Sequence, residues 1–305
     1  MRIVLIGQAA FAVKALEIIQ ARRDEIVHVF APPDPAGGRA DPLKVKALEL
    51  GLALSQPTSL RSEAAYQQFK SLNADLCVMA FVTMIVPERI LQAPRHQSIC
   101  FHPSLLPRHR GASAIAWTLI HGDSETGVTW FWPDKGIDTG PILLQRRVPV
   151  GPDVTTGSLY FNSLFSLGVE ALREALELIE SGNALRITQD EALATYEPIC
   201  RDEHARVDFS KPGRDVHNLI RGCDPQPGAF ALLDGQRLRL YEPSFHAELS
   251  GPPGTIISAG AEGLKLALRG GGIVVRRVRL EPSPNKVAPA QLAAGGELQA
   301  GAKLE

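Results

Sequence analysis

His102 and Asp138 are the residues whose types and positions are best suited to catalysis. His102 ends an apolar run, Ser98–Phe101, and a proline-bounded loop follows it. The run predicts a strand, and ligands of α/β sheets bind at the carboxyl ends of strands. Asp138 lies on a later loop, which reads G-I-D-T-G at Gly136–Gly140. A histidine and an acid on two such loops predict a catalytic pair in one crevice.

This pair is suited to adding a nucleophile to a carbonyl carbon. His102 can stabilise the oxyanion that forms, while Asp138 orients the imidazole and helps to remove a proton from the nucleophile. Cys100 lies two residues before His102, so both side chains share one face of the predicted strand. Two interpretations of Cys100 are open. It is either an apolar residue that shapes the pocket or a thiolate that forms a thioester intermediate.

Other motifs predict no metal, no NAD(P) and no protease activity. Gly7 begins a strand-to-helix turn that lacks the further glycines of a dinucleotide site. The D-T-G tripeptide at Asp138 has no second copy, which aspartic proteases require. His102, His109 and His121 lack the companions of a closed metal-ligand set. We therefore expect a metal-free site.

The composition is that of an ordinary globular enzyme. The 305 residues are 45% hydrophobic and 21% charged, with a net charge of −1. This length favours two domains, and this charge implies no strong attraction to a polyanion. Four widely spaced cysteines form no C-x-x-C pair, and Met1 leads directly into a predicted strand. No apolar run approaches the about 20 residues that span a bilayer. We expect a cytoplasmic protein without a membrane segment.

Short apolar runs alternate with helical patterns in the first half of the chain. This alternation predicts a Rossmann-like α/β fold with a mostly parallel sheet, mixed at one edge. The expected strands are 2–6, 26–30, 75–80, 98–101, 127–132 and 142–149, and the expected helices are 12–22, 42–50, 112–122 and 157–181.

Beyond residue 200 the pattern changes to short strands between Gly and Pro turns. Such strands predict a small OB-like β-barrel. They are expected at 230–233, 237–241, 254–259, 264–267 and 273–280. We therefore predict a catalytic domain at 1–200, a barrel domain at 201–292, and a disordered Ala/Gly-rich tail at 293–305.

Several motifs give the chain a family resemblance. It resembles the folate-dependent formyltransferases, which include methionyl-tRNA formyltransferase, and is most similar to the hydrolase domain of 10-formyltetrahydrofolate dehydrogenase. The resemblance extends from the first strand to about Phe230. Its main motifs are F-V-T-M-I-V-P at Phe81–Pro87, H-P-S-L-L-P-R-H-R-G-A-S-A-I at His102–Ile115, F-W-P-D-K-G-I-D-T-G at Phe131–Gly140 and H-N-L-I-R-G at His217–Gly222.

The resemblance implies 10-formyltetrahydrofolate as the formyl donor and a catalytic Asn-x-His with a distant Asp. His102 and Asp138 match the last two members, whereas Cys100 replaces the asparagine. The similar hydrolase domain also departs from asparagine there, with an apolar residue. The family's pterin-binding loop corresponds to residues 84–86, which are Met84, Ile85 and Val86.

The resemblance leads to one main functional expectation and three alternatives. The main expectation is an enzyme that removes the formyl group from 10-formyltetrahydrofolate and passes it to water or to an amine. Formylation of methionyl-tRNA is an alternative. Residues 207–305 hold twelve Lys and Arg against ten Asp and Glu, and this net charge of +2 is small for a tRNA-binding domain. The others are formylation of a sugar nucleotide or another amine, and a non-catalytic folate-binding module. The oligomeric state is left open.

Overall fold

A computed structural model describes residues 1–305, and the chain divides into two compact units. The first comprises residues 1–110, 127–147 and 163–196, and the second comprises 111–126, 148–162 and 197–305. This division is not a single cut near residue 200. Helix α5 (Ala114–Ile120) belongs to the second unit because Gly222 of helix α8 (Gly213–Gly222) packs closely against it. Each unit is described separately below.

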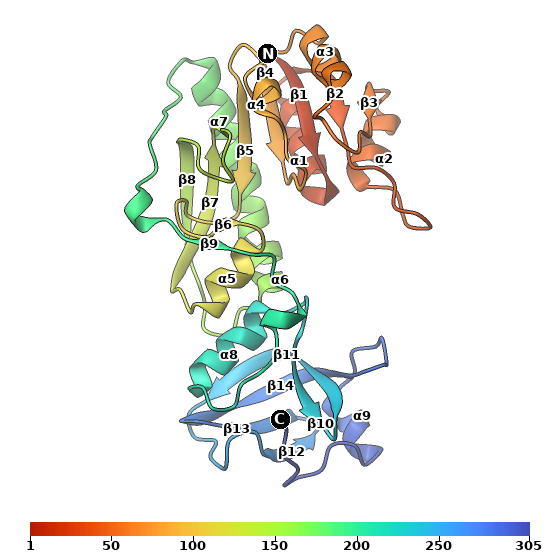
Figure 1. Cartoon of the computed structure of the whole chain (residues 1–305), viewed down its shortest axis with the longest axis vertical. Helices are drawn as coiled ribbons and strands as arrows, with labels where there is room; N and C mark the ends of the chain where they lie inside the picture. Colours follow the sequence, from red (N-terminus) through yellow and green to blue (C-terminus); the bar gives the residue numbers. More distant parts are fainter. The chain divides into compact units, whose positions relative to one another are not determined.

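A seven-stranded sheet forms the centre of the first unit (Figure 1). Its neighbouring strands are parallel from β3 to β5, and β7 runs antiparallel to β5. The prediction of a mostly parallel sheet that is mixed at one edge is confirmed. In spatial order the strands are β3 (Leu54–Ser55), β2 (Glu25–Phe30), β1 (Arg2–Gly7), β4 (Leu76–Ala80), β5 (Ser98–His102), β7 (Glu125–Phe131) and β8 (Ile142–Pro149).

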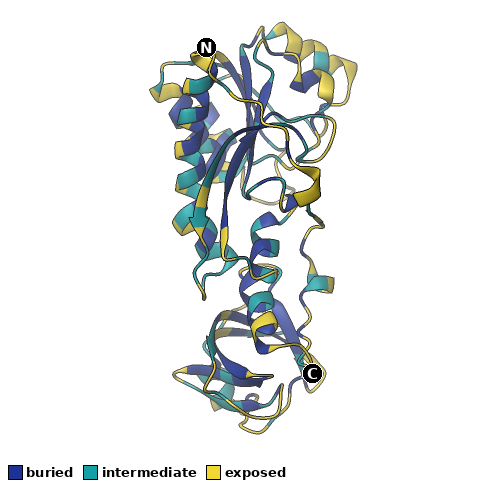
Figure 2. Cartoon of the chain, turned by 90° about the vertical axis from the view of Figure 1, so that its left-hand side faces the viewer, coloured by how far each residue is buried: buried dark blue, intermediate teal, exposed yellow.

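Helices cover both faces of this sheet, so its central strands are buried (Figure 2). On one face, Phe11 of α1 stacks on Phe101 at a ring-centroid distance of 4.1 Å, and Gly168 of α7 lies against the same ring. On the other face, α3 and α4 pack over Met79 and Cys100. The helices are α1 (Ala9–Ala21), α2 (Pro42–Glu49), α3 (Glu63–Ser71), α4 (Glu88–Leu91), α7 (Phe165–Glu180) and the 3-10 turn η2 (Glu191–Leu193).

The helix expected at 157–181 is interrupted. The chain forms α6 (Thr156–Leu159), a π-helical turn η1 (Tyr160–Leu164) and then α7. Apolar spacing does not reveal such a turn, because one extra residue in a π-bulge changes the helical period only locally.

The second unit is built on a five-stranded antiparallel sheet in the order β10-β11-β14-β13-β12. The predicted β-rich region after residue 200 is therefore confirmed. The strands are β10 (Ala229–Leu233), β11 (Gln236–His246), β12 (Ile256–Gly260), β13 (Gly263–Leu268) and β14 (Gly271–Leu280), with the 3-10 turn η3 (Asp202–His204) before them and α9 (Pro289–Ala294) after them. Two further short strands, β6 (Arg110–Gly111) and β9 (Tyr196–Glu197), pair with each other.

The prediction of a disordered tail at 293–305 is wrong, because these residues join the two edges of the five-stranded sheet. The Leu304 amide donates to the Gly254 carbonyl beside β12, and Leu232 in β10 and Glu305 exchange two backbone hydrogen bonds. Leu304 is 1% exposed in the core of this unit. The order comes from pairing with distant residues, which the Ala/Gly-rich composition does not reveal.

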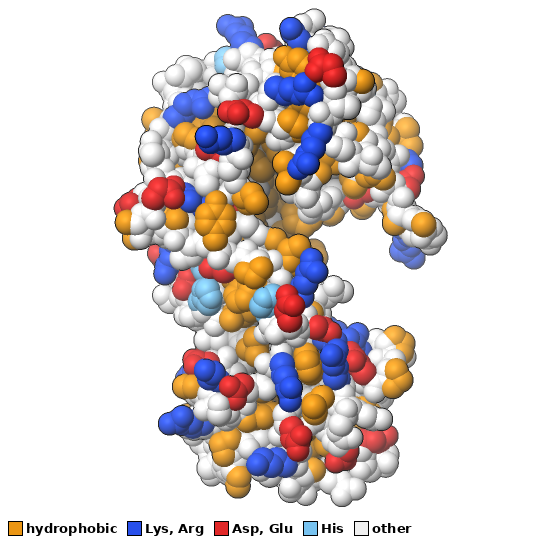
Figure 3. Space-filling model, in the orientation of Figure 1, with side chains coloured by type: hydrophobic (Ala, Val, Ile, Leu, Met, Phe, Trp, Pro, Cys, Tyr) orange, Lys and Arg blue, Asp and Glu red, His pale blue; other side chains and the backbone are white.

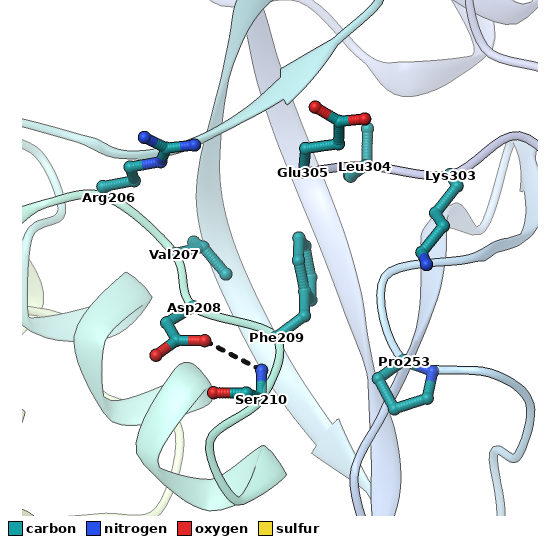
Figure 4. Close-up of a pocket in the computed structure, with 9 residues that line it drawn as sticks. All are labelled: Arg206, Val207, Asp208, Phe209, Ser210, Pro253, Lys303, Leu304 and Glu305. Atoms are coloured by element: carbon teal, nitrogen blue, oxygen red, sulfur yellow. Dashed lines mark hydrogen bonds between the residues drawn. The ribbon is translucent and has the colours of Figure 1, made fainter.

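Charges are mixed on the second unit, where the face seen in Figure 3 shows basic and acidic side chains interspersed. A groove of about 720 Å³ lies between the segment before α8 and the C-terminal residues. Arg206 and Lys303 stand on its opposite sides, with the Phe209 ring between them (Figure 4).

Candidate active site

His102 is the last residue of β5, at the carboxyl end of the parallel strands, and its side chain is 7% exposed. Its Nε2 lies 2.7 Å from the His109 carbonyl oxygen. His109 has a left-handed backbone with φ of 57°, a conformation that is uncommon outside glycine. The loop after β5 therefore curls back and fixes the ring from one side.

Asp138 lies in the loop between β7 and β8, and its Oδ2 is 3.5 Å from His102 Nδ1. The carboxylate is 19% exposed, so it is more open to solvent than the imidazole that it faces. Asp138 itself has φ of 57°. Aspartate tolerates this region better than most residues, but the conformation still requires support from its surroundings. The structure thus brings together the two residues that the sequence singled out.

These contacts fix the proton arrangement of the imidazole. A carbonyl oxygen can only accept a hydrogen bond, so Nε2 carries a hydrogen toward His109. Nδ1 then faces the Asp138 carboxylate. It is therefore the nitrogen through which the imidazole meets the carboxylate.

Cys100 lies on β5 opposite Met79 of β4 and Phe131 of β7. Its Sγ is 3.7 Å from the Phe101 carbonyl oxygen, at the distance of a weak S–H hydrogen bond. Burial and the nearby Asp138 charge raise the pKa of the Cys100 thiol well above its usual range. This environment favours a neutral thiol. It supports the interpretation of Cys100 as an apolar pocket residue rather than as a thiolate nucleophile.

The segment expected to bind the pterin follows β4 and divides into inward and outward residues. Met84 and Val86 pack on the apolar cluster that Cys100 also contacts, and Val86 is 8% exposed. Ile85 is 64% exposed and lies outside that cluster. A cavity of about 30 Å³ lies beside Met84, with Gln8 and Thr83 in its wall. Met84 and Val86 thus share an apolar cluster with Cys100, whereas Ile85 does not.

Three further residues support the pair, and none of them is assigned a role by the sequence analysis. Gln189 is 5% exposed and donates to the Asp138 and Gly140 carbonyls. Arg110 is 1% exposed and donates to Gln189, and the Tyr196 hydroxyl donates to the Ile137 carbonyl. Arg110 lies within the His102–Ile115 motif, but all three residues act on backbone or on each other, so residue type alone does not reveal their role.

Two family models match the chain. A formyl transferase model matches residues 1–176, and a formyl transferase C-terminal domain model matches residues 200–295.

Relatives with two different names align with the chain. A methionyl-tRNA formyltransferase from Geotalea uraniireducens (strain Rf4) is 39% identical over 92% of this chain and 91% of that protein. A cytosolic 10-formyltetrahydrofolate dehydrogenase from Xenopus laevis is 40% identical over 83% of this chain but 29% of that protein. The second match is thus confined to a part of a much longer enzyme.

Solved structures share the fold at low identity. HypX from Aquifex aeolicus in complex with tetrahydrofolic acid has a TM-score of 0.70 at 23% identity, over 98% of this chain and 48% of HypX. An N-formyltransferase from Helicobacter canadensis has a TM-score of 0.71 at 19% identity, over 90% of this chain and 98% of that one. None of the helices of this chain has the length and apolar character needed to cross a membrane.

Proposed function

We propose, from the premise that the chain belongs to the formyl transferase family, that it moves the formyl group of 10-formyltetrahydrofolate to an amine. The acceptor that we propose first is the amino group of methionyl-tRNA. The observation that carries the reaction is the approach of His102 Nδ1 and Asp138 Oδ2 to 3.5 Å at the carboxyl edge of the sheet.

The acceptor is supported by the extent of the alignments. A relative named methionyl-tRNA formyltransferase from Geotalea daltonii is 37% identical over 100% of this chain and 98% of that protein. Such a match includes the β-rich second unit as well as the catalytic sheet. This support outweighs the small net charge of residues 207–305, which favours water or a small amine.

The proposed reaction begins when the acceptor nitrogen adds to the formyl carbon. The formyl oxygen becomes negative, and the N–H at His102 Nδ1, on a side chain that is 7% exposed, stabilises it. Asp138 receives the proton that the acceptor nitrogen loses. The bond between the formyl carbon and N10 then breaks, and N10 takes up the proton that Asp138 received. The products are a formylated amine and tetrahydrofolate.

Hydrolysis is the second candidate, and Cys100 is the observation that favours it. The Cys100 thiol lies at hydrogen-bonding distance from the Phe101 carbonyl, so it supplies no donor in place of the family's asparagine. Loss of one oxyanion donor costs about 2.7–4 kcal/mol, or about 10²–10³ in rate. The similar hydrolase domain also lacks asparagine at this position, and there the acceptor is water.

One assay separates these functions. The purified chain is incubated with 10-formyltetrahydrofolate alone, with methionyl-tRNA, or with an amino-sugar nucleotide, and the release of tetrahydrofolate is followed. We expect release that depends on methionyl-tRNA. Release without any acceptor would identify a hydrolase, and release only with the amino sugar would identify a sugar-nucleotide formyltransferase. Folate binding without release under all conditions would contradict an enzymatic function.

A further inference from the structure

We infer that the segment 187–196, called the strap below, positions the catalytic pair, with Gln189 as its principal positioning residue. This inference rests on the proposed function, because it concerns the same His102 and Asp138. The strap lies within the first unit. It begins where Ile187 exchanges two backbone hydrogen bonds with Ile142, at the start of β8.

The strap holds the Asp138 loop through three of its carbonyl oxygens. The Gln189 amide nitrogen donates to the Asp138 oxygen at 2.8 Å and to the Gly140 oxygen at 2.7 Å. The Tyr196 hydroxyl donates to the Ile137 oxygen at 2.8 Å. These bonds bracket the peptide units on both sides of Asp138. They are the support that its left-handed backbone requires.

The strap also holds the His102 loop. The Thr195 hydroxyl accepts from the His109 amide at 2.8 Å, and the Thr195 carbonyl accepts from the Arg110 amide at 3.0 Å. His109 supplies the carbonyl that binds His102 Nε2. One continuous segment therefore fixes the backbone that aims the imidazole and the backbone that aims the carboxylate.

Arg110 connects the two sets of contacts. Its guanidinium is buried and donates twice to the Gln189 side-chain oxygen, at 3.1 and 2.9 Å. It also pairs with Glu191, whose side chain is 71% exposed. The carbonyl end of the Gln189 amide is thus held by a cation, which orients its nitrogen end toward the Asp138 loop. Glu191 contacts the same cation from the exposed side, and Glu191→Gln keeps an acceptor for Arg110, so this substitution provides a matched control.

Gln189→Glu is the most informative change. It conserves size and leaves an acceptor for Arg110, but it removes both donors to the Asp138 loop. Misplacement of a catalytic group by about 1 Å can cost about 10² in rate. We expect Gln189→Glu to lower kcat by about that factor with an unchanged Kd for tetrahydrofolate. Tyr196→Phe should have a smaller effect in the same direction, and Glu191→Gln should stay within about twofold.

A double-mutant cycle with Asp138→Asn separates positioning from a general structural effect. If Gln189 acts through Asp138, then Gln189→Glu should have almost no further effect in the Asp138→Asn background. A loss of about 10² in both backgrounds, or no loss in either, would overturn the inference.

A second measurement does not depend on turnover. Amide hydrogen exchange of peptide 133–141 should be faster in Gln189→Glu than in the wild type and unchanged in Glu191→Gln. Unchanged exchange in Gln189→Glu would overturn the role of the strap, even if the wild type is active. A wild type that releases no tetrahydrofolate, with exchange as expected, would instead refute the proposed function and leave the strap intact.

Discussion

At the scale of single residues, the imidazole of His102 has two nitrogens with different roles. Nε2 is fixed by the His109 carbonyl, and Nδ1 faces Asp138. The carboxylate therefore acts on the same nitrogen that we propose to face the formyl oxygen.

We predict that His102→Ala and Asp138→Asn each lower the rate of tetrahydrofolate release by at least about 10². Asparagine adopts the left-handed backbone as readily as aspartate, so Asp138→Asn should fold normally. Circular dichroism provides the folding control. A variant with near-wild-type rates would remove that residue from the proposed mechanism.

We also predict that Cys100 resists alkylation near neutral pH. Only the thiolate reacts, and the raised pKa of Cys100 keeps the thiol protonated. Its labelling by iodoacetamide, followed by peptide mass spectrometry, should accelerate only at a pH above that needed by an ordinary thiol. Denatured protein provides the reference rate. Rapid labelling of Cys100 at pH 7 in the folded protein would restore the thiolate alternative.

The substitution Cys100→Asn tests the missing donor directly. We expect it to preserve or raise amine-dependent transfer, measured as formylated product per unit time, because the amide adds the N–H that the thiol lacks. A complete loss of activity in a folded variant would contradict this expectation.

At the scale of elements, the last residues of the chain stabilise the second unit. Leu304 is 1% exposed, and the backbone around it joins β10 and β12. We predict that Leu304→Ala lowers the free energy of unfolding by about 2–5 kcal/mol, measured by urea denaturation. The neighbouring Lys303 is exposed, so Lys303→Ala should change it by at most about 0.5 kcal/mol. Equal effects of the two substitutions would indicate that the tail does not pack as described.

Local pattern predicted the sheet and the catalytic pair but not the contacts that depend on distant residues. The alternation of apolar runs and helices placed His102 at a strand end, because that signal lies within a few neighbouring residues. Order in the tail depends on Leu232 and Gly254, and the burial of Gln189 depends on Arg110. A lone glutamine or an Ala/Gly-rich segment carries no period from which such pairing could be predicted.

At the scale of the whole molecule, the charges bear on how an RNA acceptor could bind. In the second unit, Asp202 pairs with Arg237 and Arg239, and Glu281 pairs with Arg239 and Arg279. These pairs involve three of the twelve basic residues of 207–305, a stretch whose net charge is +2. We infer that nonspecific attraction to phosphates is weak.

Weak attraction to phosphates predicts that the affinity for an RNA acceptor depends little on salt concentration. A protein with about 6–10 phosphate contacts loses about 10³–10⁵ in affinity between 50 and 200 mM salt. We expect the KM for methionyl-tRNA to rise by much less than about 10³ over that range, with the KM for 10-formyltetrahydrofolate as the internal control. A rise of about 10³ or more in the KM for methionyl-tRNA, with an unchanged KM for 10-formyltetrahydrofolate, would show that extensive phosphate contacts exist.

The two catalytic loops receive their principal anchors, Gln189 and Thr195, from opposite ends of one short peptide. Leu193 lies between Gln189 and Thr195, is 59% exposed and belongs to a 3-10 turn. A single proteolytic cut beside Leu193 would leave Gln189, the principal anchor of the Asp138 loop, on one fragment, and Thr195 and Tyr196 on the other. The nicked enzyme could retain its sheet and its folate affinity and still lose turnover. The segment would then no longer link Gln189 to Thr195 covalently, so their relative positions would no longer be fixed.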